Sequence, residues 1–372
     1  MSKPIKLLFS AGGTGGHIIP ALAVAEAVKN KWPDTEIHFA GALGKMEMEK
    51  VPAKGYQITG LPIQGLQRSI TAKNLKFPVQ LIKSLLMANR LIKDFQPDAV
   101  AGFGGYASAP VLKTAQWKGL PTFIQEQNAF PGITNRWLAR HADVIFTAYE
   151  GMGKYFPSSK IQISGNPIRQ DFFNLPESKK ESRKHFGLDP DWPVVFLMGG
   201  SQGARAINHA VAHHIEYFIR NKIQLIWQTG KFYFDEAKEI ISKHNAEDTI
   251  KPYIFIDEIH RAYSAATIMV ARAGAISIAE ISAAGKACIF VPLPTAAENH
   301  QYKNAMKLVN HKAADIIQNN ELKERLRGKI ESLINNPGHI KEIEQNIQTF
   351  ARPGASEKIA ATIMKQIMQS DD

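Results

Sequence analysis

The chain has 372 residues, of which 44% are hydrophobic and 21% are charged, a composition typical of an ordinary globular protein with room for two domains. Its net charge of +11 favours an anionic partner, which would be a nucleic acid, a phosphorylated metabolite or an acidic membrane surface. The single cysteine, Cys288, excludes an intrachain disulfide. No apolar run approaches the roughly 18 residues of a membrane-spanning helix, and we expect no signal peptide.

Short apolar runs alternate with helical stretches through the first half of the chain. The runs predict strands at 7–9, 36–41, 99–102, 121–124 and 144–147. After the first strand and a glycine-rich turn, we expect a helix to begin at Pro20, a residue suited to a first helical turn. This alternation is typical of a parallel sheet flanked by helices.

The pattern restarts after a polar stretch at 176–184. Further strands are predicted at 193–198, 225–229, 268–271 and 287–292. Each half therefore opens with a strand and a glycine-rich loop, and the halves meet near 164–167. The sequence predicts two similar α/β domains.

The two glycine-rich loops, 12–17 and 199–205, are candidate diphosphate sites. Such loops let backbone N–H groups approach an anion, and the following helix N-terminus adds partial positive charge. Neither loop is a P-loop, because no Gly-Lys-Ser/Thr follows. A nicotinamide site needs a carboxylate at the end of the second strand, and the segments 39–44 and 227–230 contain none. A dehydrogenase is therefore less favoured without being excluded.

Asp189-Pro190-Asp191 matches the aspartate pair with which many glycosyltransferases hold a divalent ion. It lies just before a predicted strand, whereas ligands of such sheets bind beyond the carboxyl ends of the strands. We therefore interpret this segment as a turn and expect no metal site.

Seven segments in this order resemble one family, the bacterial MurG family, whose members add N-acetylglucosamine to undecaprenyl-pyrophosphoryl-N-acetylmuramyl-pentapeptide (lipid I) to give lipid II. The resemblance runs from about Leu7 to the C-terminal helix. The segments are 12–17 (GGTGGH), 102–106 (GFGGY), 125–128 (QEQN), 165–169 (GNPIR), 199–205 (GGSQGAR), 275–280 (AISIAE) and 298–301 (ENHQ).

The resemblance implies an α/β fold with two Rossmann-like domains facing across a cleft, the GT-B type of glycosyltransferase. It implies an acceptor and membrane-facing domain at 1–163, a UDP-sugar domain at 164–348, and a C-terminal helix at 349–372 that returns to the first domain. The implied reaction is an inverting transfer from UDP-N-acetylglucosamine to the 4-hydroxyl of lipid I, without metal or cofactor. The implied setting is peripheral, on the cytoplasmic face of the inner membrane, with an anionic lipid surface, cell-wall synthesis proteins and no nucleic acid as partners.

Inversion needs a base that takes the proton of the acceptor hydroxyl, a role worth roughly 10²–10⁴ in rate. His17, directly after the first glycine loop, is our first choice. It is one of 12 histidines, and an arbitrary one would more often cap a helix or lie in a core. The alternative role for His17 itself is to bind or orient the acceptor instead of taking its proton. By resemblance, Glu126 and Tyr106 are the alternatives, and Glu126 could equally be a loop carboxylate in an ion pair.

Donor contacts are carried over only to positions that match the family's motifs. At several of these positions the contact implied by the family is made by the backbone, a hydroxyl or an amide. The positions are Thr14, Gly15, Gly16, Asn128, Arg169, Ser201, Ile256, Ala275, Ile276, Ser277, Ile278, Ala279, Glu280 and Gln301.

By this resemblance, Arg169 and Ser201 bind the diphosphate and the backbone of Ile256 reads uracil. Glu280 accepts the ribose hydroxyls, and Gln301 contacts the sugar. Two departures limit the match. Alanine stands at 273 where the family often has serine, and segment 298–301 differs in detail from some members.

The stretch between Gly55 and Lys93 contains no Asp or Glu and interleaves basic with apolar residues. Such a segment suits an anionic leaflet, at about 1 kcal/mol per basic residue near the surface. Within it, Leu81, Leu85, Ala88 and Ile92 have helical spacing and are expected to face the domain core. The predicted lipid contacts are Leu75, Lys76, Phe77 and Trp117.

Two other functions compete with the transferase. A UDP-sugar 2-epimerase has a similar twin fold but no reason to carry the acid-free stretch. A non-catalytic nucleotide- or membrane-binding protein belongs to a different class. Transfer of labelled sugar to a lipid I analogue separates all three.

Overall fold

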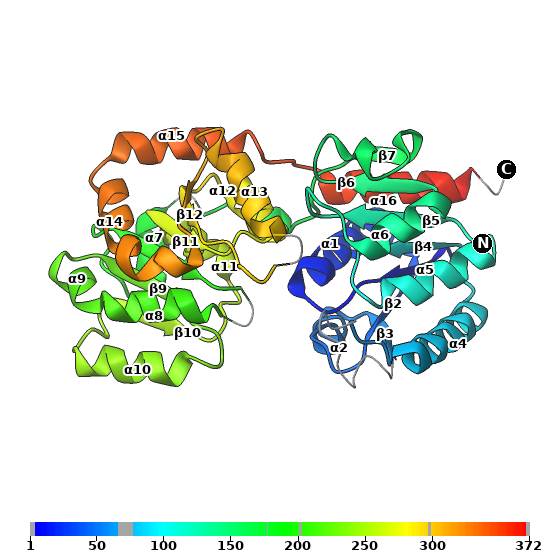
Figure 1. Cartoon of the computed structure of the whole chain (residues 1–372), viewed down its shortest axis with the longest axis horizontal. Coiled ribbons are helices and arrows are strands. Elements are labelled where there is room, and N and C mark those ends of the chain that lie inside the picture. The colour runs from blue at the N-terminus through cyan, green and yellow to red at the C-terminus, as the bar shows by residue number, and fades with distance from the viewer. Residues whose placement is uncertain (1–3, 66–76, 177, 201–202, 297–298, 370–372) are drawn as a thin grey trace. The chain divides into compact units, whose positions relative to one another are not determined.

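The computed structural model describes residues 4–65, 77–176, 178–200, 203–296 and 299–369. It divides into two compact units (Figure 1), which we call the N-terminal unit (Met1–Ile168 with Gly354–Asp372) and the C-terminal unit (Arg169–Pro353). The last helix, α16 (Ala355–Met368, red in Figure 1), thus belongs to the N-terminal unit.

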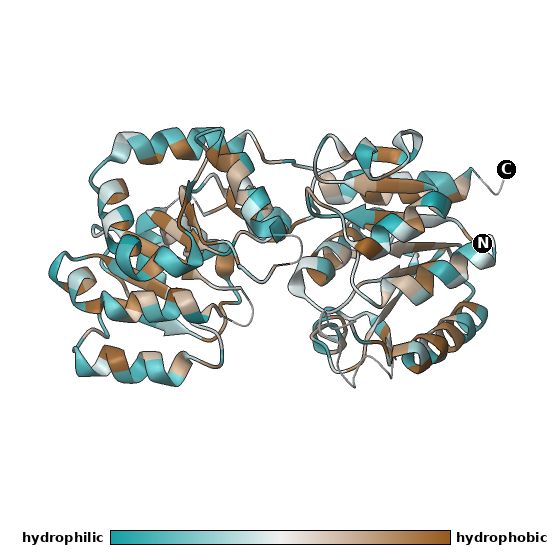
Figure 2. Cartoon of the chain, in the orientation of Figure 1, coloured by the Kyte–Doolittle hydropathy of each residue, from teal (hydrophilic) through white to brown (hydrophobic). Residues whose placement is uncertain are grey.

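The N-terminal unit is built on a parallel sheet in the order β3-β2-β1-β4-β5-β6-β7. Its strands are β1 (Lys6–Ser10), β2 (Glu36–Ala42), β3 (Gln57–Leu61), β4 (Ala99–Gly102), β5 (Thr122–Glu126), β6 (Val144–Thr147) and β7 (Ile161–Ile163). Adjacent residues of a strand point to opposite faces, so the buried strands carry apolar residues almost throughout. Figure 2 shows this as hydrophobic colour along β4, β5 and β6.

Helices cover both faces of this sheet. The described helices of the unit, besides α16, are α1 (Gly15–Lys31), α2 (Glu47–Lys50), α4 (Phe77–Phe95), α5 (Ser108–Trp117) and α6 (Ile133–Leu138). Phe9 packs with residues of α1 and α16 on one face. Leu8, its neighbour in the strand, packs with residues of α4, α5 and α6 on the other.

The expected start of the first helix at Pro20 is wrong. Helix α1 begins at Gly15, and Pro20 lies inside it. The glycines after Thr14 open the helix directly from the loop, and His17 donates its backbone N–H to Thr14 O at 3.1 Å. As a result, His17 lies in the first turn of α1, beside the loop.

The C-terminal unit has a second parallel sheet in the order β10-β9-β8-β11-β12-β13. Its strands are β8 (Val194–Met198), β9 (Gln224–Gln228), β10 (Ile250–Tyr253), β11 (Ile268–Ala271), β12 (Cys288–Phe290) and β13 (Asp315–Ile316). Its described helices are α7 (Lys179–His185), α8 (Arg205–His213), α9 (Ile215–Arg220), α10 (Phe234–Lys243), α11 (Ile259–Ala265), α12 (Ala275–Ala284), α13 (His300–Val309), α14 (Leu322–Ile334) and α15 (Pro337–Gln348). Cys288 is buried, as expected for a core residue.

Each sheet reverses its strand order once. In the N-terminal unit the reversal lies between β1 and β4, and in the C-terminal unit between β8 and β11. Ligands of such sheets bind beyond the carboxyl ends of the strands at the reversal. Both glycine-rich loops follow a strand at this position. The predicted fold class, an α/β protein of two parallel-sheet domains, is therefore confirmed.

Candidate functional site

The side chain of His17 is hydrogen-bonded to the first glycine loop. The Nδ1 atom of His17 lies 2.9 Å from Gly12 O and 3.2 Å from Thr14 Oγ1. A backbone carbonyl only accepts hydrogen bonds, so Nδ1 is the protonated nitrogen and donates to Gly12 O. In the neutral ring the lone pair is then on Nε2.

The loop after β4 packs against the first glycine loop and His17. A Cβ atom at Gly104 would lie 2.7 Å from His17 Cδ2, and one at Gly105 would lie 2.1 Å from Gly12 O. Both glycines have positive φ, 92° and 84°. Only glycine lets this loop pass so close to the first one. Tyr106 follows with 49% of its surface exposed.

The close approach at Gly105 predicts a stability difference between two alanine variants. Gly105→Ala combines a left-handed φ with a clash against Gly12 O, whereas Gly119→Ala has φ 71° and no atom within 4 Å. We expect Gly105→Ala to lower the free energy of unfolding by roughly 1–3 kcal/mol more than Gly119→Ala. Urea unfolding of both variants measures this, and equal losses would contradict the packing.

A buried carboxylate that was not predicted from the sequence binds the backbone of the first glycine loop. Glu47 is fully buried, and its Oε1 accepts hydrogen bonds from Gly13 N at 3.0 Å and Ala42 N at 2.9 Å. Its run, Lys45 to Lys50, reads as solvated surface. The only available signal was Gly41 inside a predicted strand, since such a glycine often marks close approach of another group.

Glu126 lies at the end of β5 and organises the loop that follows. It accepts hydrogen bonds from Asn128 N (2.9 Å), Asn128 Nδ2 (3.2 Å), Gly132 N (3.1 Å) and Asn135 Nδ2 (2.8 Å). Burial raises the pKa of Glu126, while these donors act in the opposite direction. Its Oε1 therefore fixes the position of Asn128, while Oε2 holds Gly132 and Asn135.

A second polar network beside it was also missed. Gln127 Nε2 donates to Phe103 O at 2.7 Å, Gln125 Nε2 donates to Asn166 Oδ1 at 3.1 Å, and Asn166 Nδ2 donates to Gln127 O at 3.1 Å. All three amide side chains are buried. They join the loops after β4 and β5 to the 165–168 segment. These amides belong to the motif segments 125–128 and 165–169, but hydrophobic patterning gives no signal for their hydrogen bonds.

The second glycine loop makes an equally tight turn after β8. A Cβ at Gly199 would lie 2.2 Å from Ala204 N, and one at Gly203 would lie 2.1 Å from Thr229 O. Gly203 N donates to Gly200 O at 3.0 Å. Ser201, the predicted diphosphate ligand, lies outside the described residues. The described part of the loop leads directly into α8, whose N-terminus favours an anion.

Glu280 of α12 interacts with Tyr263 of α11 and with the charge of Arg169. Glu280 is buried, and Tyr263 Oη donates to its Oε2 at 3.4 Å. Burial raises the pKa of Glu280 to about 7, while the charge of Arg169 and the Tyr263 hydrogen bond act in the opposite direction. Arg169 in turn lies over the ring of Phe172, at 5.1 Å from its centroid.

The predicted donor residues divide between the units: Thr14, Gly15, Gly16 and Asn128 lie in the N-terminal unit, and the others lie in the C-terminal unit. Ile256 is buried just after β10. Ala275, Ile276 and Ile278 are buried in α12, while Ser277 and Ala279 are partly exposed. Gln301 lies in the first turn of α13, and its Oε1 accepts a hydrogen bond from Leu293 N at 2.9 Å. Of segment 298–301, Glu298 lies outside the described residues.

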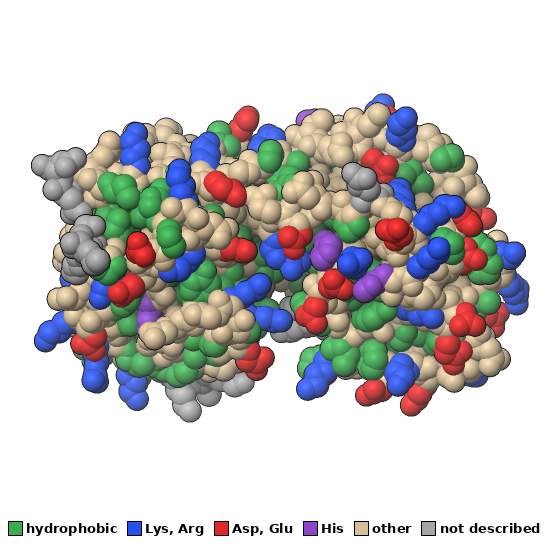
Figure 3. Space-filling view, turned by 180° about the vertical axis from the view of Figure 1, so that it is seen from behind, with side chains coloured by type: hydrophobic (Ala, Val, Ile, Leu, Met, Phe, Trp, Pro, Cys, Tyr) green, Lys and Arg blue, Asp and Glu red, His purple; other side chains and the backbone are tan. Residues whose placement is uncertain are grey.

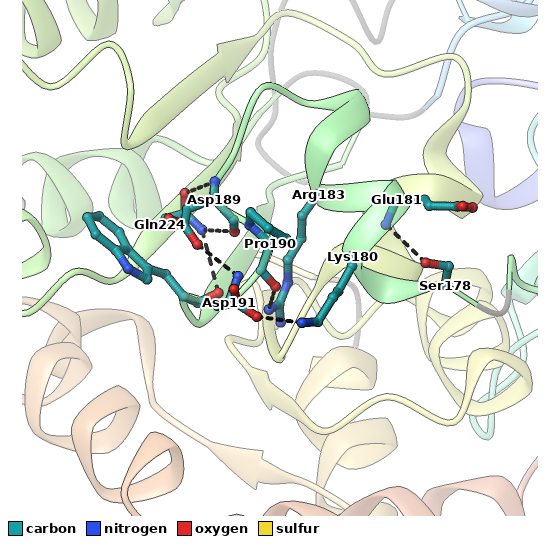
Figure 4. Close-up of polar contacts among 9 residues, drawn as sticks. Ser178, Lys180, Glu181, Arg183, Asp189, Pro190, Asp191 and Gln224 are labelled. Atoms are coloured by element: carbon teal, nitrogen blue, oxygen red, sulfur yellow. Dashed lines mark hydrogen bonds and ion pairs between the residues drawn. The ribbon is translucent and has the colours of Figure 1, made fainter.

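The aspartates of the 189–191 segment are held in a turn (Figure 4). Asp191 N donates to Asp189 Oδ1 at 2.8 Å, an Asx turn. Lys180 Nζ lies 2.7 Å from Asp191 Oδ1 and lowers the pKa of that carboxyl. Gln224 bonds both Asp189 N and Asp189 O. Among the described residues, no three His, Cys, Asp or Glu side chains gather in a way that could hold a metal ion.

Helix α4 turns an apolar row outward. Val79, Ile82 and Leu86 are 55%, 57% and 65% exposed, and their spacing puts them on one side of the helix. Ala88 and Ile92 are buried, which confirms that they face the core. Figure 2 shows broad hydrophobic bands on α4.

Helix α5 packs on α4 and ends at Trp117, which is 65% exposed. Lys113 lies over both Trp117 and Trp137, at 5.5 and 5.3 Å from the ring centroids. On the face drawn in Figure 3, basic and acidic side chains are interspersed on each unit. Leu75 and Lys76 lie outside the described residues, and Phe77 opens α4 partly buried. Within the described residues, no helix has the length and apolar content needed to cross a bilayer.

Comparison with known proteins relates these sites to one family. The models of the N-terminal and C-terminal domains of glycosyltransferase family 28 match residues 7–147 and 194–359. A relative from Cytophaga hutchinsonii, named UDP-N-acetylglucosamine–N-acetylmuramyl-(pentapeptide) pyrophosphoryl-undecaprenol N-acetylglucosamine transferase, is 44% identical over 98% of both chains. The chain belongs to the MurG family.

Solved structures agree with this family assignment and show that other proteins share the fold. MurG from Acinetobacter baumannii is 28% identical, with a TM-score of 0.75 over 98% of this chain and 100% of that one. A UDP-N-acetylglucosamine 2-epimerase shares the fold, with a TM-score of 0.65 over 100% of this chain and 98% of that one, at 12% identity. The fold of this MurG-family chain is thus of the GT-B type, and its sequence likeness is to the transferases.

Proposed function

We propose that this protein transfers N-acetylglucosamine from UDP-N-acetylglucosamine to undecaprenyl-linked lipid I, giving lipid II. The observation that carries the proposal is the 44% identity to the Cytophaga transferase across 98% of both chains. The loops at both sheet reversals fit it, because a transferase has to hold two phosphorylated substrates. We propose that the acceptor binds the N-terminal unit and the donor the C-terminal unit.

His17 is the proposed general base of an inverting reaction. Its Nδ1 donates to Gly12 O at 2.9 Å, so Nε2 is the nitrogen that takes the acceptor proton. Glu126 suits this task less, because its oxygens already accept four hydrogen bonds from the loop it shapes. Glu126 therefore orients Asn128 toward the donor sugar, and the exposed Tyr106 contacts the acceptor.

The C-terminal unit holds the donor. Glu280 accepts the ribose hydroxyls, the backbone at Ile256 reads the uracil, and Gln301 contacts the sugar. Arg169 and Ser201 bind the diphosphate together with the N-terminus of α8. A guanidinium and a helix N-terminus neutralise the charge that develops on the departing UDP, and the proposed reaction accordingly uses no metal.

The membrane surface is contacted by the N-terminal unit. The exposed row on α4 lies beside Lys83 and Arg90, and Trp117 stands at the end of the adjoining α5. Apolar side chains flanked by cations bind anionic leaflets by insertion and by charge. A lipid acceptor requires such contact, and we propose that the enzyme is peripheral, on the cytoplasmic face of the inner membrane.

The double variant Ile82→Asp/Leu86→Asp is expected to bind vesicles containing phosphatidylglycerol at least tenfold more weakly. Each apolar side chain moved from water into lipid contributes roughly 1.5–3 kcal/mol. Sedimentation with vesicles measures the binding. Phe232→Asp is the matched control, because Phe232 is 88% exposed on the C-terminal unit. Unchanged binding of the double variant, or an equal loss in the control, would remove α4 from the membrane contact.

The overall reaction is tested with the purified full chain, radiolabelled UDP-N-acetylglucosamine and a lipid I analogue. We expect label in the lipid product. Folded protein that binds UDP but transfers no label would overturn the proposal, and release of free 2-epimer would point to an epimerase instead.

A further inference from the structure

A buried carboxylate and the proposed base lie on opposite sides of one peptide group. The peptide between Gly12 and Gly13 donates its N–H to Glu47, at 3.0 Å from Oε1 and 3.2 Å from Oε2. The carbonyl of the same peptide accepts from His17 Nδ1 at 2.9 Å. The three groups therefore form a continuous row: carboxylate, peptide and imidazole.

Several features hold the carboxylate in place. Its Oε1 also accepts from Ala42 N at 2.9 Å, which fixes it to the end of β2. A Cβ at Gly12 would lie 2.7 Å from Glu47 Oε1, and one at Gly41 would lie 2.6 Å from Glu47 Cγ. Glycine at both positions leaves the space that the Glu47 side chain fills. The side chain is fully buried.

We infer that Glu47 is a positioning residue for His17 and acts through the Gly12–Gly13 peptide. The inference rests on the proposed role of His17 as base. A charge-assisted hydrogen bond on the N–H side polarises a peptide and makes its carbonyl a stronger acceptor. The stronger acceptor keeps the proton on Nδ1, so the lone pair stays on Nε2. Glu47 touches no substrate in this role.

This arrangement gives His17 what an aspartate gives the histidine of a catalytic triad, which is a fixed ring orientation and tautomer. Here the carboxylate is one peptide group removed from the ring. Because Gly105 packs against the Gly12 carbonyl, the row also sets where the loop after β4 passes. Loss of Glu47 should therefore lower kcat and leave the KM for the donor, held by the other unit, unchanged.

The first test is spectroscopic and does not depend on turnover. The full chain is labelled with 15N-histidine, and the His17 signals are identified by their loss in His17→Ala. Long-range 1H–15N correlation should show the Nδ1–H tautomer in the wild type and a mixture with Nε2–H in Glu47→Ala. A wild-type ring in the Nε2–H form would overturn the inference.

The second test is a double-mutant cycle with Glu47→Gln, which keeps the shape of the side chain and removes its charge. We expect kcat to fall about tenfold, the difference between a charge-assisted and a neutral hydrogen bond. In a His17→Ala background the same change should have no further effect, because Glu47 acts through His17. Glu36→Gln, exposed on the neighbouring strand, is the control and should keep wild-type kcat.

The outcomes separate the two proposals. If His17→Ala retains full turnover, the base assignment fails, while the tautomer spectra still decide whether Glu47 positions the ring. If Glu47→Gln keeps wild-type kcat, or lowers it equally with and without His17, the positioning role is overturned. Thermal unfolding and UDP binding of each variant show that the protein is folded.

Discussion

Replacement of His17 by alanine is expected to lower kcat for transfer to a lipid I analogue by about 10²- to 10⁴-fold, the usual contribution of a general base. UDP should still bind with wild-type affinity, because the residues proposed to bind its uracil, ribose and diphosphate lie in the C-terminal unit. Transfer of radiolabel measures kcat, and calorimetry measures UDP binding.

His141→Ala is the matched control for this variant. His141 is exposed in the N-terminal unit, so its loss should leave both measurements unchanged. Turnover of His17→Ala within about twofold of wild type would remove His17 from the chemistry. Loss of UDP binding in His17→Ala would mean that the N-terminal loop also serves the donor.

Glu280→Gln is expected to weaken binding of UDP-N-acetylglucosamine by about tenfold or more at pH 8. Hydrogen bonds to a charged group contribute roughly 1.5–3 kcal/mol, and the ionised carboxylate is proposed to accept from both ribose hydroxyls. Calorimetric titration measures the affinity. Glu239→Gln, exposed on α10, should bind as the wild type does.

The pKa of Glu280, raised by burial to about 7, gives this effect a pH dependence. Below pH 7 the folded protein holds the proton, and the donor must displace it, so wild-type affinity should fall as the pH drops from 8 to 6. Glu280→Gln carries no titrating group there and should show a flat profile over that range. Parallel slopes in the two proteins would contradict the assignment.

The same shift affects stability with a definite sign. The folded-state pKa lies above the value of 4.5 for an unburied glutamate, so the protonated form favours the folded state. Stability from this group is complete below pH 4.5 and is lost as the pH rises through 7. Glu280→Gln should therefore unfold at a higher temperature than the wild type at pH 8, even though it binds the donor less well.

The central strands were predictable from sequence because they are buried on both faces and read as continuous apolar runs. The edge strands β3, β7, β10 and β13 were not predicted. The strands β7 and β13 are short. The strands β3 and β10 carry polar residues, such as Gln57 and Lys251, because the faces of an edge strand are only partly covered. The start of α1 was missed because glycine is a poor helix former, and the loop geometry overrides that preference.

The candidate site also has parts that were predicted from the sequence and parts that were not. The glycine loops and His17 carry recognisable motifs, and the fold puts those loops at the strand-order reversals. Glu47 belongs to no motif and is revealed only by the N–H groups of Gly13 and Ala42 that it binds. Gln127 and Asn166 lie in the motif segments 125–128 and 165–169, but nothing in the sequence indicated their hydrogen bonds to Phe103 O and Gln127 O. The glycine loops and their place in the fold were therefore predictable, and the hydrogen bonds of the buried polar groups that shape the loops were not.

Helix α16 has a consequence for how the protein is made. Ile359, Ile363 and Ile367 complete the core of the N-terminal unit, so that core stays open until the ribosome has translated the final helix. The residues of the C-terminal unit are contiguous, and all of them are synthesised before α16. Chains usually complete their first domain first during synthesis. Here the order of synthesis is reversed: a ribosome stalled before residue 355 would have synthesised every residue of the C-terminal unit but not the helix that completes the N-terminal unit.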